Sequence, residues 1–101
     1  MVNMQHYIYM LRPTQPDMMS NLSDGQQSIM VDHFDNLKRM LRDGSLLLAG
    51  PCTDEAFGIV IFTAESIKEA QKIAGDDPAV KAGLMTAECH EFHVSLQSGR
   101  D

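Results

Sequence analysis

The chain has 101 residues, 44% of them hydrophobic, which suits a single domain (residues 1–101) with a buried core. Its 8 basic and 14 acidic residues give a net charge of −6 and are scattered along the chain. This balance argues against nucleic-acid binding, because phosphate contacts need a clustered basic face. No apolar run approaches the roughly 20 residues of a membrane-spanning helix. Because there is no visible secretory signal and only Cys52 and Cys89 are available to pair, we expect a cytoplasmic protein with free thiols.

The first predicted element is a strand at residues 6–11, where aromatic and apolar side chains run up to Pro13. A polar stretch follows, and then a long helix is predicted to begin near Asp24 and to end at Gly44. Ser23 and Gln26 form a capping box in front of this helix. Its apolar side chains recur every three or four residues: Ile29, Met30, Phe34, Leu37, Met40 and Leu41.

Four further elements are predicted in the second half of the chain. Two apolar strands are expected at residues 46–49 and 57–62, followed by a helix at residues 66–74 with a cap at Ser66 and Glu69. Asp77-Pro78 resembles a helix N-cap with proline at the first helical position, which predicts a short helical turn. The last strand is predicted at residues 86–96, with alternating apolar side chains on one face: Phe92, Val94 and Leu96.

The order of these elements is β-α-β-β-α-β, which is typical of an α+β ferredoxin-like fold with a four-stranded antiparallel sheet. Helices then cover one face of the sheet. Residues 7–11 and 57–62 are apolar at nearly every position, a pattern found in strands that are buried on both faces. Something must therefore cover the second face, and we predict that a second copy does so in a two-fold homodimer.

His33 lies among the apolar positions of the long helix, on the side that should face the core. A buried imidazole without a polar partner costs about 1–3 kcal/mol, so this side chain needs one. One interpretation is a core histidine that donates to a backbone carbonyl. The other is a proton-transfer group in a pocket between helix and sheet. Position in the sequence does not decide between them.

The chain resembles the YCII-related family of small dimeric α+β-barrel proteins over about residues 5 to 96. The resemblance rests on His33, the run LLLAGP at residues 46–51, the strand at residues 58–62, the helix at residues 66–74 and the segment DDPAVKAG at residues 76–83. It implies a ferredoxin-like β-α-β-β-α-β fold that dimerises as an α+β barrel. The connection between the second and third strands is shorter here than in relatives, and the segment at residues 14–27 also differs. Both are expected to line the mouth of a pocket.

The resemblance also implies a site. The family's proposed His–Asp dyad falls on His33 and Asp77, and one relative removes chloride from a chlorinated aromatic diol. This implies an acid–base enzyme (a lyase, isomerase or dehalogenase) that acts without a cofactor on a small cyclic or aromatic compound. The alternative is a non-catalytic dimer that binds a small ligand or regulates. Asp77 also has a purely structural interpretation as a helix cap.

Three other residues are candidates for substrate binding. Arg12 ends the first strand, where it is placed to clamp an anionic substrate or to remain in solvent. Tyr7 and Tyr9 alternate onto one face of that strand, either lining the pocket or packing in the core.

The cluster Cys89, His90 and His93 looks like a metal site in the sequence. On a strand, however, His90 and His93 point to opposite faces and cannot easily share an ion. We therefore predict no metal site, and the sequence contains no cofactor motif.

Overall fold

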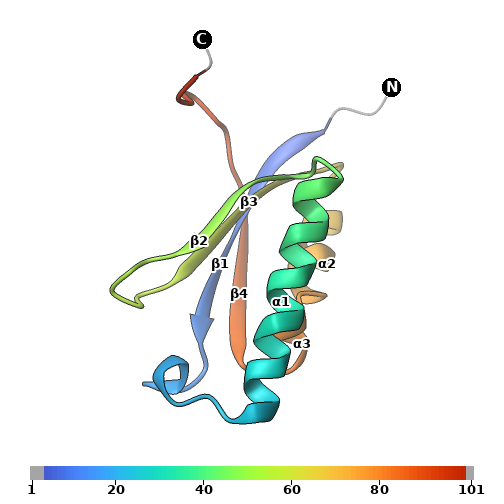
Figure 1. Ribbon diagram of the computed structural model, residues 1–101. Helices are drawn as coiled ribbons and strands as arrows, with labels where there is room; N and C mark the ends of the chain where they lie inside the picture. Colours follow the sequence, from blue (N-terminus) through green and yellow to red (C-terminus); the bar gives the residue numbers. More distant parts are fainter. Residues whose placement is uncertain (1–3, 100–101) are drawn as a thin grey trace.

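The computed structural model describes residues 4–99, which form one four-stranded antiparallel sheet in the order β2-β3-β1-β4 with the helices on one face (Figure 1). The elements are β1 (Gln5–Pro13), a 3-10 turn (Met18–Ser20), α1 (Asp24–Arg42), β2 (Leu46–Pro51), β3 (Gly58–Ala64), α2 (Ile67–Gly75), α3 (Pro78–Lys81) and β4 (Met85–Glu91). The predicted element order and the ferredoxin-like α+β fold are confirmed. The short α3 is the helical turn predicted at Asp77-Pro78.

The ends of α1 are set by local hydrogen bonds, as the sequence predicts. The Gln26 amide donates to Ser23 Oγ (3.2 Å), and the Ser23 amide donates to Gln26 Oε1 (2.9 Å), which completes the capping box. Just past the C-terminal end of α1, Gly44 takes a φ of +86°, a conformation that costs glycine little and other residues more. These hydrogen bonds and the glycine fix where α1 begins and where the chain turns toward β2.

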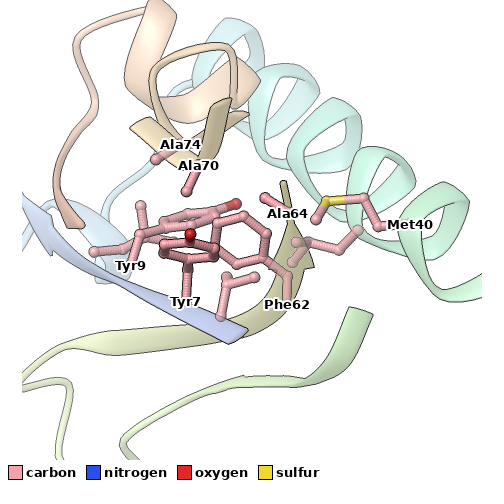
Figure 2. Packing of buried hydrophobic residues seen from close by; sticks show 10 residues of the cluster. Tyr7, Tyr9, Met40, Phe62, Ala64, Ala70 and Ala74 are labelled. Carbon is pink, nitrogen blue, oxygen red and sulfur yellow. The ribbon is translucent and has the colours of Figure 1, made fainter. Parts of the chain in front are cut away.

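The core lies between the sheet and the helices and is built around three aromatic rings (Figure 2). The ring centroid of Phe62 lies 5.6 Å from that of Tyr9 in an edge-to-face arrangement, and 6.1 Å from that of Tyr7. Ala70 and Ala74 of α2 pack against these rings, and their small side chains let the helix approach the sheet closely. The rings are therefore packed between the sheet and α2.

The face of the sheet that points away from the helices is also apolar. Because Tyr7, Tyr9, Val60 and Phe62 belong to the core, the side chains between them point to the opposite face. The apolar part of this open sheet face consists of Ile8 and Met10 of β1, Ile59 and Ile61 of β3, and Leu48 of β2, which pairs with Ile61 and is 48% exposed. At its β4 edge, Glu88 and His90 pair with Met10 and Ile8 and point the same way. The two-sided apolar pattern of the sequence thus corresponds to two apolar faces.

The last strand is shorter than predicted. β4 ends at Glu91, and the prediction that it continues to residue 96 was wrong. Tyr7 pairs with Glu91 and the Phe92 amide donates to the His6 carbonyl, so β1 has almost no length left to pair with further residues. The alternating pattern continues beyond the end of the partner strand, and Leu96 is 93% exposed.

Both cysteines, Cys52 and Cys89, are free. Cys52 follows β2 and Cys89 lies on β4. Within residues 4–99, no helix has both the length and the apolar character needed to cross a membrane.

Candidate active site

His33 and Asp77, which are 44 residues apart in the sequence, are in direct contact. His33 lies in α1 and Asp77 is the N-cap of α3, and the two helices pack against each other. His33 Nδ1 is 2.7 Å from Asp77 Oδ1 and 2.9 Å from Oδ2. Asp77 is fully buried and His33 is 9% exposed. The polar partner that the buried imidazole needs is therefore a carboxylate and not a backbone carbonyl.

The Asp77 carboxylate accepts hydrogen bonds from two further groups. The Tyr9 hydroxyl donates to Oδ2 (2.7 Å), and the Ala79 amide donates to Oδ1 (2.9 Å). The bond from Ala79 is the helix cap, so Asp77 is both an N-cap and the partner of His33. Both of its oxygens are occupied by protein donors inside the fold.

The electrostatics of the pair follow from these donors. Burial raises the pKa of Asp77. This effect is outweighed by the hydrogen bonds from His33 and Tyr9, by the positive charge of a protonated His33 and by the bond from the Ala79 amide. The pKa of Asp77 therefore lies below its ordinary value. Burial, together with the neighbouring Asp77 charge, raises the pKa of Tyr9, so its hydroxyl keeps its proton and donates. Asp77 is accordingly ionised at neutral pH.

An ionised carboxylate only accepts hydrogen bonds, and this assigns the tautomer of His33. The proton of the neutral imidazole belongs on Nδ1, where it is donated to Asp77. Nε2 then carries the free lone pair. The arrangement provides a base whose orientation is fixed by a buried anion.

A groove of about 940 Å³ opens beside His33, between α1 and the hairpin of β2 and β3. Its α1 wall includes Phe34 and Leu41, which are 56% and 60% exposed, although the periodicity of the helix suggested that they face the core. The groove is predominantly apolar, and Lys38 and Glu55 are its charged lining residues. Met19 and three residues of the connection after β2 also line the groove: Cys52, Thr53 and Glu55.

Phe34 and Lys38 also line the groove, and neither was predicted as a residue of the site. Lys38 Nζ lies 4.9 Å from the centroid of the Phe34 ring, one helical turn away. Their spacing of four residues predicts that the two side chains lie together on the helix. It does not predict that the β2–β3 hairpin leaves this side of α1 open.

The candidate binding residues lie at different places. Tyr9 touches Asp77, but neither Tyr7 nor Tyr9 lines the groove, and both rings are buried in the core. Arg12 is half-exposed and pairs with Glu88 of β4 at 3.4 Å. Its guanidinium lies 5.7 Å from the centroid of the Phe57 ring, which lines the groove. Arg12 is thus near the groove but not beside the dyad.

The structure also separates the residues that looked like a metal cluster. His90 lies within β4 beside Glu88 (3.5 Å between Nε2 and Oε1), whereas His93 follows the end of that strand. Within the part of the chain that the structure describes, no three His, Cys, Asp or Glu side chains are grouped to hold a metal ion.

Acid is expected to remove the stabilisation that Asp77 provides. The pKa of Asp77 is lower in the folded chain than the ordinary value of 3.8, so the ionised carboxylate stabilises the fold at higher pH. This contribution is fully present above about pH 4 and is lost as the pH falls through the folded pKa. In urea denaturation followed by circular dichroism, the stability difference between wild type and Asp77→Asn should shrink from pH 5 to pH 3, a range that lies below the ordinary titration of histidine. A difference that is constant with pH would contradict this.

Comparisons with known proteins agree with this fold. The family model of the YCII-related domain matches residues 6–92. Among solved structures, the chain is similar to 5-chloro-2-hydroxyhydroquinone dehydrochlorinase from Burkholderia phenoliruptrix AC1100 in complex with 2,5-dihydroxybenzoquinone. The TM-score is 0.64 with 18% identity, and the match covers 86% of this chain and 93% of that chain. A comparison with curated protein sequences finds no significant match.

Proposed function

The chain belongs to the YCII-related family, and from this premise we propose that it is an acid–base enzyme that acts on a small cyclic or aromatic compound, with His33 as the base. One observation carries the proposal: a histidine held by a buried aspartate lines an apolar groove. A histidine that served only the core would be sealed from such a groove. The similar dehydrochlorinase, whose printed ligand is a small ring, supports a substrate of this class.

The chemistry follows from the lone pair on Nε2 of His33. In an elimination from the keto tautomer of a ring quinol, the leaving group lies on a saturated ring carbon, and Nε2 takes the proton of a hydroxyl that is conjugated with that carbon. The electrons of the O–H bond form a new carbonyl, the ring double bond moves to the carbon that holds the leaving group, and the leaving group departs with the electrons of its own bond, for example as chloride. The imidazolium that forms is stabilised by Asp77, which stays ionised. An isomerisation uses the same first step and returns the proton to another atom.

Asp77 acts through His33 in this proposal. It is fully buried and both its oxygens are bonded to protein donors, so it is a positioning residue and not a group that touches the substrate. The substrate ring lies against apolar walls from α1 and the β2–β3 hairpin, with Lys38 and Glu55 as the polar groups of the groove. Exclusion of water by these walls strengthens the interaction between the imidazolium and the carboxylate.

The test uses 5-chloro-2-hydroxyhydroquinone as a probe, with chloride release measured under anaerobic conditions. We expect release that depends on the enzyme, and a loss of about 10²–10⁴-fold in His33→Gln, because a positioned base contributes this much. His93→Gln, at an exposed histidine that follows the end of β4, is the matched control and should retain full activity. Binding of 2,5-dihydroxybenzoquinone without turnover of any ring substrate in a panel of chlorinated and unchlorinated quinols would favour the non-catalytic binding dimer instead.

We further propose that the protein is a homodimer in which two open sheet faces pack together. The support is that Ile8, Met10, Ile59, Ile61 and Leu48 form an apolar face that the helices leave uncovered. An apolar face of this kind is typical of an interface. Two such sheets stack in a sandwich, and because Leu48 and Ile59 also line the groove, the interface adjoins the groove of each copy.

A further inference from the structure

The hydroxyl of Tyr9 is an unusual feature of an otherwise apolar core. Tyr9 is fully buried, and its ring packs edge-to-face against Phe62, so it has little freedom to move. Its hydroxyl donates a 2.7 Å hydrogen bond to Asp77 Oδ2, the oxygen that is also 2.9 Å from His33 Nδ1. A phenylalanine would fill the same space without this bond. The hydroxyl is therefore placed for the carboxylate and not for packing.

We propose that Tyr9 is a positioning residue of the candidate site, which holds the Asp77 carboxylate for His33 and keeps the imidazole available as a base. This role rests on the proposed function of His33. Tyr9, Asp77 and His33 form a chain of hydrogen bonds that starts in β1, passes through the N-cap of α3 and ends in α1 at the groove. The sheet core thereby sets the geometry of a side chain on a helix.

The direction of the effect follows from charge. When His33 is neutral, Asp77 carries an unbalanced negative charge, and the hydrogen bond from Tyr9 stabilises it strongly. When His33 is protonated, its charge balances that of Asp77, and the same hydrogen bond stabilises the carboxylate less. Tyr9 therefore favours the neutral imidazole, against the pull of Asp77 toward the protonated form.

Few other titratable groups face this chain of hydrogen bonds. Cys89 of β4 is near Tyr9, and burial raises the pKa of its thiol, so it remains uncharged at neutral pH. Strands β2 and β3 contain no titratable side chain, and Lys38 and Glu55 lie along the groove. Lys68, Lys72 and Lys81 of α2 and α3 are exposed, whereas Glu69 of α2 is partly buried and its charge acts on Tyr7. The charge on His33 is therefore governed mainly by Asp77 and Tyr9.

The test is the titration of Asp77 and His33 by NMR in Tyr9→Phe, with carbon-13 carboxyl signals for Asp77 and ring signals for His33. Loss of the hydrogen bond should raise the pKa of Asp77 and move the His33 titration to higher pH, each by about half to one pH unit. If the protein turns over a ring substrate, the acidic limb of its pH–rate profile should move by the same amount. The NMR titrations need no turnover, so they decide the role of Tyr9 even if the enzymatic proposal fails.

Tyr7→Phe is the matched control, because Tyr7 lies two residues away on the same face and its hydroxyl does not contact Asp77. A second variant strengthens the bond instead of removing it. The chain has two tyrosines, so 3-fluorotyrosine incorporated into Tyr7→Phe labels only Tyr9 with a stronger donor. This protein should show shifts of the opposite sign. Titrations that stay within about 0.2 pH units of wild type in both Tyr9 variants would overturn the proposal.

Discussion

Asp77→Asn is expected to reduce turnover of a ring substrate by about 10²–10⁴-fold while the protein remains folded. The carboxamide keeps its oxygen at the Oδ1 position for the Ala79 amide, and its NH₂ group replaces Oδ2, where it donates to Nδ1 of His33 and no longer accepts from the Tyr9 hydroxyl. The imidazole proton then moves to Nε2, and the lone pair that faces the groove is lost. The helix cap alone predicts a cost below about 1 kcal/mol. The buried Tyr9 hydroxyl also loses its acceptor, so we expect the free energy of unfolding to fall by about 1–3 kcal/mol.

The control for Asp77→Asn is Asp76→Asn at the neighbouring position. Asp76 is exposed and pairs only with Lys72 of α2 among the described side chains, at 2.8 Å, so its replacement should leave turnover unchanged. The double variant of His33→Gln and Asp77→Asn should be no worse than the poorer single variant, as for residues that act as a unit. Multiplicative losses would show that the two side chains contribute independently.

Ile8→Asp is expected to dissociate the proposed homodimer. Ile8 lies in a central strand on the open sheet face, opposite Ile61, and does not line the groove. A carboxylate buried there without a partner costs several kcal/mol, whereas the same carboxylate on a monomer remains in water. Sedimentation should therefore show a dimer for wild type and a monomer for the variant, with helix content largely retained.

Gln71→Asp, on the exposed side of α2, adds the same charge away from the open sheet face and should remain dimeric. An interface formed by this face should bury more than about 2,000 Å² in total if the dimer is obligate. A wild-type chain that sediments as a stable, folded monomer at micromolar concentration would exclude the dimer.

Most of the fold was predictable because its signals are local. The capping box at Ser23, the glycine after α1 and the proline of α3 each act within a few residues, and each lies where the sequence predicts. The end of β4 was not predictable, because it depends on where β1 begins. The alternation of apolar side chains from Phe92 onward is typical of a strand, but β1 has no residues left for these positions to pair with.

The candidate site was predictable only in part. The resemblance brought His33 and Asp77 together, and the structure adds Tyr9, whose hydroxyl lies on the core side of the carboxylate. No spacing in the sequence indicates this contact, since Tyr9 and Asp77 are 68 residues apart. The groove could not be predicted from the sequence for another reason. Periodicity cannot distinguish a helical side chain that faces the core from one that faces a cavity, and Phe34 belongs to the second kind.

The tautomer of His33 tests the central claim most directly. Nitrogen-15 NMR at neutral pH distinguishes a protonated from an unprotonated ring nitrogen, and His33→Gln identifies the signals among the four histidines of the chain. We expect a neutral ring with the proton on Nδ1, bonded to Asp77, and a free lone pair on Nε2. A ring protonated on Nε2 alone would contradict it, because His33 would then offer no base to the groove.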